Sequence, residues 1–467
     1  MYIKQFYTNC LSEAAYYVES EGEVAIFDPL RDIDVYLELA NSRKAKIKYI
    51  FETHFHADFV SGHIDLSQQT NAPIIFGPNA KPSYPIYSAK DGETLSLGNI
   101  TIETIHTPGH TLESTCYLVK DENNKPHAIF TGDTLFVGDV GRPDLSSGHL
   151  SSEELAGIMY DTMQNKILPL EDDIIVYPAH GPGSSCGKNL GPNTFSTIGE
   201  QKQSNYALQS QSKEDFVKAV TTGLQSAPVY FAVNAKINQT GYQAITTVTQ
   251  NGSQALSISE FKKHIENGAV ILDTRNATTF TSGFIPGSIS IGLEGRFAEW
   301  AGSLLPFDQP IVLVTEKGKE EESVIRLSRV GFEKMQGCLK GGFDAWTSAG
   351  EPIDMIIDIE ADELVMDIPH DPRLMVVDVR KEAEFADGHL ENALLLPLNE
   401  MNDTARLAQF EEHQNLYIHC AGGYRSVIAS SLLKRQGIHN IKNVLGGWSK
   451  IKEQKGASIK KEVSALN

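Results

Sequence analysis

Residues 53–59 read Thr-His-Phe-His-Ala-Asp-Phe, directly after a predicted strand that ends at Phe51. His54, His56 and Asp58 stand at every second position on this exit from strand to loop, so their side chains can converge on one point. Imidazole and carboxylate groups are suitable ligands for borderline or hard divalent metals. The segment therefore predicts a metal site at the end of a strand.

Three further segments place a metal-capable side chain in a turn-rich loop after a predicted strand. They read Pro108-Gly109-His110, Gly132-Asp133-Thr134 and Pro178-Ala179-His180. Loops at one edge of a scaffold are where functional sites are commonly built. A single His is more often a polar residue satisfied within the fold, but several such segments in one region favour a shared metal centre.

The region around these segments alternates short β-rich runs with helical patterns. Predicted strands cover residues 23–27, 47–51, 74–76, 100–105, 115–119, 128–131 and 174–177, and predicted helices cover 34–41 and 152–163. Ser151 precedes the second helix and acidic residues fill its first turn, which is typical of a helix N-terminus. The mixture predicts an α/β domain over residues 1–240.

The composition limits the classes of function. The 467 residues suggest about three domains at roughly 150 residues each. With 41% hydrophobic and 21% charged residues, the chain resembles a soluble globular protein. Its 40 Lys and Arg face 60 Asp and Glu, for a formal net charge of −20. We therefore expect neither a nucleic-acid partner nor an anionic membrane partner, because both require a basic surface.

Targeting signals and disulfides are not expected. The sequence has no apolar run of about eighteen residues, so no transmembrane helix is predicted. Residues 1–6 lack the basic start and apolar stretch of a signal peptide. The five cysteines are widely spaced, at 10, 116, 186, 338 and 420. An odd, sparse set predicts reduced thiols in a cytoplasmic protein.

The C-terminal half contains an internal repeat. Residues 272–275 (Leu-Asp-Thr-Arg) recur as 377–380 (Val-Asp-Val-Arg), so Asp273 and Asp378 lie 105 positions apart. The Gly-Gly-aromatic segment that begins at Gly341 recurs at Gly446 with the same offset. Each copy reads strand, helix, strand, helix, which predicts a parallel sheet covered by helices. We expect a polar linker at 241–255 and domains at 256–351 and 360–456.

The second copy contains a nucleophile motif. Residues 416–426 read Leu-Tyr-Ile-His-Cys-Ala-Gly-Gly-Tyr-Arg-Ser, so a predicted strand ends at Cys420 and a helix begins near Arg425. Backbone N–H groups of a loop containing Gly422 and Gly423, the helix N-terminus and Arg425 all favour a thiolate. A thiolate attacks sulfur, and the same donors suit an anionic persulfide. The alternative, a structural thiol at a strand end, leaves this context unexplained.

The first copy has lost these groups. At the offset of 105, Thr315 takes the position of Cys420 and Glu320 takes that of Arg425. The nucleophile is absent, and an acid would disfavour an anion. We expect residues 256–351 to be inactive and to serve in spacing, in docking or in shaping access.

The N-terminal segments resemble the metallo-β-lactamase superfamily, which implies an αββα sandwich with the metal at one edge. In the dinuclear zinc hydrolases of that superfamily, the first motif reads His-x-His-x-Asp-His. Here Phe59 occupies the last position and cannot bind a metal. The resemblance therefore favours a mononuclear site.

Within the superfamily, residues 132–136 (Gly-Asp-Thr-Leu-Phe) and 139–144 (Asp-Val-Gly-Arg-Pro-Asp) are similar to persulfide dioxygenases. This resemblance implies one Fe(II) per chain, bound by His54, His110 and Asp133. Two His and one carboxylate leave open positions for oxygen and substrate, as non-haem Fe(II) oxygenases require. The ligands alone would also accept zinc or manganese.

Other residues near this motif have expected supporting roles. His56, Asp58 and His180 would orient the ligands or hold water. Arg142 either binds an anionic group of the substrate or pairs with a carboxylate such as Asp144. Cys186, shortly after His180, either carries a persulfide or is a small buried residue.

The C-terminal repeat resembles rhodaneses, which are sulfurtransferases. Gly388-His389-Leu390 and Gly446-Gly447-Trp448 fit that family, as does the Cys420 loop with Gly422, Gly423 and Arg425. The resemblance implies that Cys420 becomes a persulfide in a double-displacement cycle. In one direction the persulfide passes its outer sulfur to sulfite and makes thiosulfate. In the other direction Cys420 takes sulfur from thiosulfate to form the persulfide. Asp378 and Arg380 are expected to brace the fold.

The complete chain thus resembles persulfide dioxygenase–rhodanese fusion proteins, which oxidise a low-molecular-weight thiol persulfide with O₂ to thiol and sulfite. The expected partners are that persulfide, O₂, and sulfite or thiosulfate, and a homo-oligomer is implied. The carrier thiol is open between glutathione, coenzyme A, bacillithiol and inorganic sulfide. One alternative is a zinc-dependent thioester hydrolase of the glyoxalase II type fused to rhodanese. Another is a non-enzymatic sulfur carrier or sensor.

Overall fold

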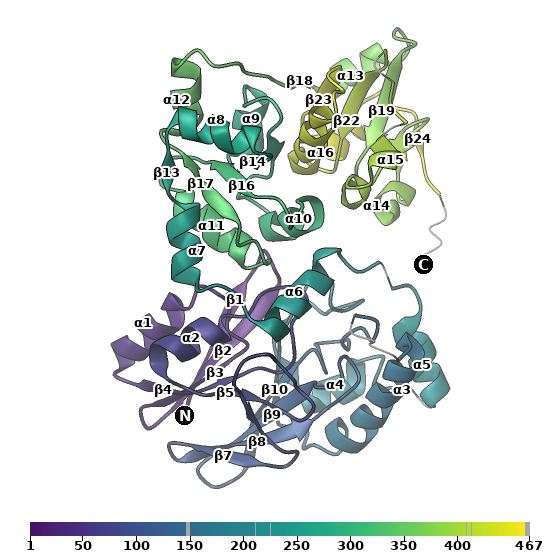
Figure 1. Ribbon diagram of the computed structural model, residues 1–467. Helices are drawn as coiled ribbons and strands as arrows, with labels where there is room; N and C mark the ends of the chain where they lie inside the picture. Colours follow the sequence, from purple (N-terminus) through teal and green to yellow (C-terminus); the bar gives the residue numbers. More distant parts are fainter. Residues whose placement is uncertain (146–149, 211, 225, 408, 412, 463–467) are drawn as a thin grey trace. The chain divides into compact units, whose positions relative to one another are not determined.

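The computed structural model describes residues 1–145, 150–210, 212–224, 226–407, 409–411 and 413–462 (Figure 1). The chain divides into two compact units. The first comprises Met1–Ile245 with Ser328–Gly331, and the second comprises Thr246–Leu327 with Phe332–Asn467. Each unit has its own sheets and its own buried core.

Two six-stranded sheets form the centre of the first unit. The first has the order β1 (Tyr2–Thr8), β2 (Glu13–Ser20), β3 (Glu23–Phe27), β4 (Lys46–Phe51), β5 (Ile74–Phe76), β6 (Tyr87–Ser88). The second has the order β12 (Ser196–Thr197), β11 (Ile175–Pro178), β10 (Pro126–Gly132), β9 (Thr115–Lys120), β8 (Ile100–His106), β7 (Thr94–Leu97). Aromatic side chains fill the space between them, and the rings of Phe27 and Phe130 stack at 4.1 Å.

Helices cover the outer face of each sheet. Buried side chains of α1 (Asp34–Arg43) and α2 (His63–Thr70) pack on the first sheet, through Tyr36 and Leu66. The helices α3 (Ser152–Thr162), α4 (Ile198–Ser204) and α5 (Lys213–Thr221) pack on the second. Ser151 and Glu154 form a capping box that starts α3, as its sequence predicts. The π turn η1 (Met163–Ile167) and α6 (Tyr230–Thr240) complete the unit. The predicted αββα sandwich is confirmed.

Strand directions explain why the candidate ligands meet. β9 is antiparallel to both β8 and β10, so β8 and β10 run the same way, and β11 is parallel to β10. Their carboxyl ends therefore lie at one edge of the sheet, and the loops that follow carry His110, Asp133 and His180. His54 follows β4 in the facing sheet.

The second unit contains two five-stranded parallel sheets with equivalent strand orders. The first is β13 (Ala255–Leu256), β17 (Met335–Leu339), β16 (Ile311–Val314), β14 (Val270–Asp273), β15 (Ile289–Ser290). The other is β18 (Ile357–Ile359), β23 (Ile441–Val444), β22 (Asn415–His419), β19 (Leu374–Asp378), β21 (Leu394–Leu395). This confirms two copies of one parallel α/β domain, as the repeat predicts.

Helices surround these sheets. They are α8 (Ile258–Glu266), α9 (Ala277–Thr281), α10 (Phe297–Leu304), α11 (Glu320–Ser328) and α12 (Gly342–Ser348) in the first copy. In the second copy they are α13 (Ala361–Asp367), α14 (Glu382–Ala386), η2 (Leu398–Glu400), α15 (Thr404–Leu407), α16 (Tyr424–Arg435) and α17 (Gly447–Ile451). A small sheet pairs β20 (His389–Leu390) with β24 (Ile459–Lys460).

The repeated Asp-x-Arg segments form the same buried ion pair in each copy. Arg380 Nη2 donates to Asp378 at 2.6 Å and to the Gly388 carbonyl at 2.7 Å. Arg275 makes the equivalent bonds to Asp273 and to Gly283, at 2.6 and 2.9 Å. Each pair ties a strand end to the loop that follows, which is the bracing role expected for them.

One element lies where the sequence predicts a polar linker. The helix α7 (Ile245–Gly252) occupies most of residues 241–255. Ile245 and Val248 are three positions apart and both are buried, so they give this polar stretch one apolar face. Because most residues of the segment are polar, this apolar face is difficult to recognise in the sequence.

Candidate metal centre and sulfur-transfer loop

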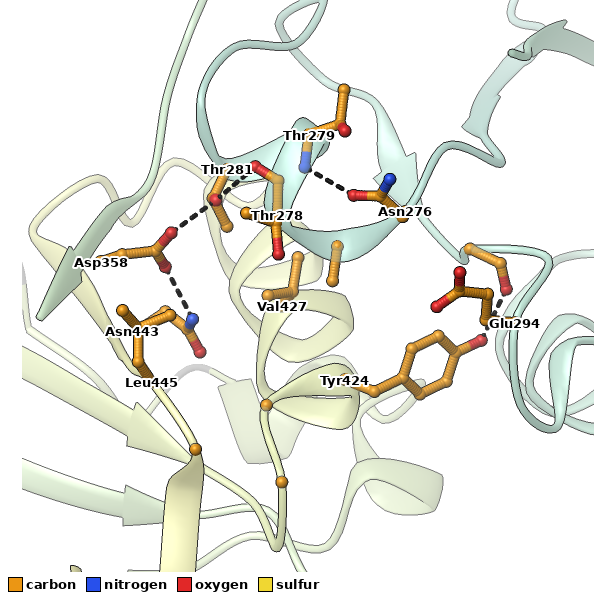
Figure 2. A pocket seen from close by; sticks show the side chains of 15 residues that line it. Asn276, Thr278, Thr279, Thr281, Glu294, Asp358, Tyr424, Val427, Asn443 and Leu445 are labelled. Atoms are coloured by element: carbon orange, nitrogen blue, oxygen red, sulfur yellow. Dashed lines mark hydrogen bonds between the residues drawn. The ribbon is translucent and has the colours of Figure 1, made fainter. Parts of the chain in front are cut away.

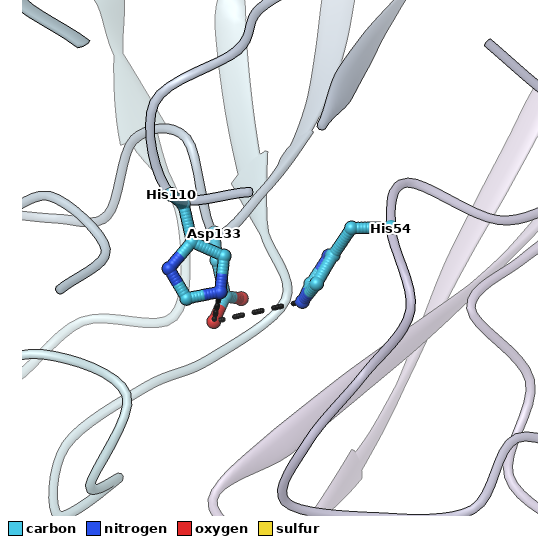
Figure 3. A group of neighbouring side chains, drawn as sticks. All are labelled: His54, His110 and Asp133. Atoms are coloured by element: carbon cyan, nitrogen blue, oxygen red, sulfur yellow. Dashed lines mark ion pairs between the residues drawn. The ribbon is translucent and has the colours of Figure 1, made fainter. Parts of the chain in front are cut away.

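His54, His110 and Asp133 converge on one point, as Figure 3 shows. Asp133 Oδ2 lies 3.5 Å from His110 Nε2 and 3.9 Å from His54 Nε2. Each of the three residues is about 2% exposed. The structure therefore brings together the three residues that the resemblance to persulfide dioxygenases implies as ligands, each from a different loop.

Hydrogen bonds fix which ring nitrogen of each histidine faces this point. His110 Nδ1 lies 2.8 Å from the Arg142 carbonyl oxygen, which can only accept, so Nδ1 carries the proton. The Thr53 hydroxyl donates to Asp28 at 2.9 Å and so accepts from His54 Nδ1, 3.0 Å away. In both rings Nε2 is the nitrogen that faces Asp133. Both are thus oriented as metal ligands.

The electrostatics of the group fit a cation. Both carboxylate oxygens of Asp133 are buried and have no hydrogen-bond partner among the described residues. Leaving a buried carboxylate uncompensated is costly. Burial, followed by the neighbouring histidines, holds the pKa of His54 well below its usual range, so its ring is neutral. Two imidazoles and one carboxylate are a suitable donor set for a divalent metal.

His56 lies next to this group but has acidic partners of its own. Its Nε2 is 3.0 Å from Asp28 Oδ1 and 3.8 Å from Glu52 Oε2. Burial alone would lower the pKa of His56, but the surrounding carboxylates outweigh it and raise the pKa to about 9. The ring is therefore a buried imidazolium at neutral pH. Phe59 is fully buried against it, with ring centroids 4.3 Å apart.

Asp58 and His180 form a second close group with His56, and Cys186 lies close to Asp133 and His180. His180 Nε2 is 3.3 Å from Asp58 Oδ2 and 3.5 Å from Asp133 Oδ1. The Cys186 sulfur belongs to a group with Asp133 and His180 whose ligand atoms all lie within 4.8 Å of one another. Burial and then the Asp58 and Asp133 carboxylates hold the pKa of Cys186 well above its usual range, so it is a neutral thiol.

Arg142 forms the carboxylate pair that the sequence leaves as one of two alternatives. Its Nε and Nη2 atoms each donate to the Asp144 carboxylate at 2.7 Å, and Nη1 donates to the Ser185 carbonyl at 3.3 Å. The geometry supports the structural role. A contact with the substrate remains a prediction.

The sequence analysis did not identify Asp28, whose side chain contacts Thr53 and His56 next to the candidate ligands. Its carboxylate accepts hydrogen bonds from the Thr53 backbone and hydroxyl and forms an ion pair with His56. Asp28 directly follows β3, just as the predicted ligands follow their strands, and this position was the available signal. Its φ of 48° lies in the left-handed region, which non-glycine residues seldom adopt.

The Cys420 loop has the predicted form. Cys420 directly follows β22, and α16 begins at Tyr424 after Gly423, whose φ is 110°. The Gly423 backbone N–H donates to the Cys420 sulfur at 3.1 Å, and the Ser426 hydroxyl lies 3.6 Å from it. Gly422 is exposed in the same loop. Arg425 is held by a bidentate pair with Glu384, both bonds being 2.7 Å.

The equivalent loop of the first copy follows β16. Thr315 stands at the strand end and is 5% exposed. The helix α11 then opens with Glu320, Glu321 and Glu322. All five cysteines of the chain are free thiols, and Cys420 alone among them occupies a loop of this kind. The first copy thus keeps the scaffold without the nucleophile.

Comparison with known protein families assigns both regions. Residues 8–180 match the metallo-beta-lactamase superfamily, and residues 257–349 and 360–454 each match the rhodanese-like domain. The crystal structure of a metallo-beta-lactamase from Staphylococcus aureus subsp. aureus COL matches with a TM-score of 0.66 and 31% identity. That match covers 73% of this chain and 99% of that one.

The chain belongs to the metallo-beta-lactamase superfamily. Its superfamily domain is followed by two rhodanese-like domains. A hydroxyacylglutathione hydrolase of Francisella tularensis subsp. novicida is 31% identical over 182 residues, which are 38% of this chain and 68% of that protein.

Other relatives of the superfamily domain carry a similar description. Two probable hydroxyacylglutathione hydrolases of Schizosaccharomyces pombe are 30% and 34% identical over 166 and 177 residues. These matches cover 35% and 37% of this chain, and the chain spans 60% and 64% of the length of these relatives. Among the described helices, none has both the length and the apolar character required to cross a membrane.

Proposed function

We propose that the superfamily domain is a non-haem iron persulfide dioxygenase and that the second rhodanese-like domain is a sulfurtransferase. The overall oxidation converts a thiol persulfide, O₂ and water into thiol and sulfite, with release of two protons. The observation that carries the proposal is the convergence of His54, His110 and Asp133 with both Nε2 atoms directed at one point. A bound Fe(II) would supply open coordination positions for O₂ and sulfur.

The residues around the triad support this chemistry. The His56 imidazolium is paired with Asp28, so it braces the loop instead of acting as a ligand. Asp58 and His180 form a second pair that positions the Asp133 carboxylate or a water molecule. We assign Cys186 to the substrate side of the site, because its sulfur lies beside Asp133 and His180. Arg142 holds the His110 ring through its carbonyl.

In the second activity, Cys420 is the nucleophile. Its thiolate attacks the outer sulfur of thiosulfate, the S–S bond of thiosulfate breaks, and sulfite leaves while a Cys420 persulfide forms. The Gly423 N–H that already contacts the sulfur stabilises the negative charge of the product. Run in reverse, the same step makes thiosulfate from sulfite. We place both reactions in the cytoplasm, because all five cysteines are free thiols. A homo-oligomer is part of the proposal through the resemblance alone.

One observation favours a second candidate function. The relatives of the superfamily domain are described as hydroxyacylglutathione hydrolases, so a zinc-dependent thioester hydrolase on the same scaffold is the competing proposal. Phe59 counts against it, because an aromatic ring stands where the dinuclear hydrolases of the superfamily have a ligand.

Metal analysis combined with oxygen uptake separates the two candidates. The protein is purified anaerobically and supplied with glutathione persulfide. About one iron per chain, O₂ uptake and sulfite release would support the dioxygenase. Zinc content, no O₂ uptake after reconstitution with Fe(II), and hydrolysis of a glutathione thioester would overturn it. An Asp133→Asn variant is the matched control, because it keeps the side-chain shape and removes the ligand charge.

A further inference from the structure

A cavity of about 500 Å³ lies beside the Cys420 loop, within the second unit. Residues 422–424 line one side of it, and residues 276–279 and Glu294 of the first rhodanese-like copy line the other (Figure 2). A volume of this size suits a small-molecule ligand. The glycine whose N–H contacts the Cys420 sulfur, Gly423, is therefore also part of the cavity wall.

Direct contacts hold the wall supplied by the inactive copy. The Tyr424 hydroxyl, at the start of α16, donates to the Gly292 carbonyl at 2.9 Å. Farther along the same helix, the Ser431 hydroxyl accepts from the Ser290 N–H at 3.0 Å. The helix that follows the nucleophile is thus tied to the first copy at both ends of its buried face. These two bonds connect the opposite walls of the cavity.

The lining is rich in hydrogen-bond acceptors. Among the described residues that line it, none is Lys, Arg or His, whereas Glu294 and Asp358 are carboxylates. Asn443 is 2% exposed, and its Nδ2 donates to Asp358 at 2.7 Å. Its Oδ1 is buried with no hydrogen-bond partner in the described part of the chain. An unsatisfied buried acceptor beside carboxylates favours a ligand with N–H donors and positive charge.

We propose that this cavity binds the ammonium-bearing part of an organic thiol that accepts sulfur from Cys420. The inactive copy then selects the acceptor. This inference rests on the proposed sulfurtransferase function and gives it a direction, from thiosulfate to an organic persulfide. Sulfite is a bare anion, so the carboxylates of Glu294 and Asp358 provide no electrostatic attraction for it.

The transfer step balances without an oxidant. The acceptor thiolate attacks the outer sulfur of the Cys420 persulfide and forms a new S–S bond. The bond between that sulfur and Cys420 Sγ breaks, and Cys420 leaves as a thiolate. The ammonium group of the acceptor stays in the cavity and takes no part in the bond changes.

Three thiol acceptors of similar size but different charge test whether the cavity favours an ammonium group. Cysteamine carries an ammonium group, mercaptoethanol is neutral and mercaptopropionate carries a carboxylate. With Cys420 preloaded from thiosulfate, kcat/KM should be highest for cysteamine and lowest for mercaptopropionate. Glu294→Gln and Asp358→Asn should each lower the cysteamine-to-mercaptopropionate ratio about threefold to fivefold. Glu321→Gln, an exposed acid of α11 outside the lining, should leave the ratio unchanged.

Asp358 also accepts from Thr281 and Asn443, so its variant can loosen the fold. Glu294 is exposed, and Glu294→Gln then carries the test alone. An unchanged ratio in a folded Glu294→Gln protein would overturn the inference, as would equal use of the three acceptors by the wild type.

A binding measurement keeps this inference separate from the activity itself. S-methylcysteamine and methylthiopropionate cannot accept sulfur, and their binding to the full chain is compared by saturation-transfer NMR in a Cys420→Ser background. Preference for the ammonium compound, reduced by Glu294→Gln, supports the cavity assignment. Equal binding contradicts it even where sulfur transfer is active. Failure of Cys420 to take sulfur from thiosulfate would instead refute the sulfurtransferase proposal, and the binding preference would still decide the role of the cavity.

Discussion

A single hydroxyl determines which nitrogen of His54 is available to a metal. The Thr53 hydroxyl donates its hydrogen bond to Asp28, so toward His54 Nδ1 it can only accept. Replacing the hydroxyl by a methyl group keeps the shape of the side chain but removes the acceptor. The ring would then be free to rotate or to change tautomer.

We expect Thr53→Val to bind iron about 10- to 100-fold more weakly than the wild type. Thr53→Ser retains the hydroxyl and should bind as the wild type does. A competition titration with a coloured chelator, on protein whose folding is checked by circular dichroism, measures both. Wild-type affinity in the valine variant would contradict the assigned hydrogen bonds.

A second residue, Cys338 in the first rhodanese-like copy, gives the stability of the chain a pH dependence. Burial, with a smaller contribution from Glu320, raises the pKa of Cys338 to about 12 from an ordinary value of 9.0. The unfolded state therefore loses this proton at lower pH than the folded state does. The contribution of the thiol to stability is complete below pH 9 and is lost as the pH rises toward 12.

The prediction is that Cys338→Ala flattens the alkaline limb of the stability curve. Relative to pH 8, the wild type should lose about 1 kcal/mol more than the variant by pH 10. Urea unfolding at several pH values measures the free energy of unfolding of both proteins. Parallel curves for the two proteins would show that Cys338 does not titrate differently on folding.

At the scale of elements, the metal centre depends on how closely two loops approach. The Gly141 N–H donates to the Asp133 carbonyl at 2.9 Å, and the next residue supplies the carbonyl that holds His110. A Cβ at Gly141 would lie 2.1 Å from the Asp133 carbonyl oxygen and 2.9 Å from His110 Nδ1. Only glycine allows this contact without moving both ligands.

Gly141→Ala should therefore lower the free energy of unfolding by about 1–3 kcal/mol and weaken metal binding. Gly157→Ala is the matched control, because a Cβ there meets only the flexible end of Lys213, 3.0 Å away, and alanine suits a helix. Thermal unfolding and metal content are measured on both variants. Normal metal content in Gly141→Ala would show that the loops can separate without cost.

Some features of the fold and of the candidate site could be predicted from the sequence, and others could not. A cluster of metal-capable side chains was predictable, because His54, His110 and Asp133 each follow a strand that ends in a turn. The choice of these three as the ligands came from the resemblance to persulfide dioxygenases. Asp28 was missed because its role depends on a left-handed backbone and on Thr53 from the neighbouring strand. The helix α7 was missed because only Ile245 and Val248 give it an apolar face. The cavity beside Gly423 depends on contacts between residues more than 130 positions apart, such as Tyr424 with Gly292.

At the scale of the whole molecule, the metal centre and the sulfur-transfer loop belong to separate units, each with its own core. A local change in one site should leave the chemistry of the other intact. Cys420→Ser should abolish sulfur transfer from thiosulfate and spare O₂ uptake. Asp133→Asn should do the reverse. Oxygen-electrode and thiosulfate:cyanide assays on the same preparations measure the two activities, and loss of both in either variant would refute the two-site description.

The loop after β16 in the first rhodanese-like copy shares a backbone feature with the Cys420 loop. Gly318 stands 105 positions before Gly423, and both have a left-handed φ, 81° and 110°. Around a thiol this conformation aims an N–H at the sulfur, but Thr315 has no thiol to receive it. The two loops therefore share a left-handed glycine at this position, although only the second has the cysteine and the arginine. The backbone conformation of the loop does not depend on the nucleophile.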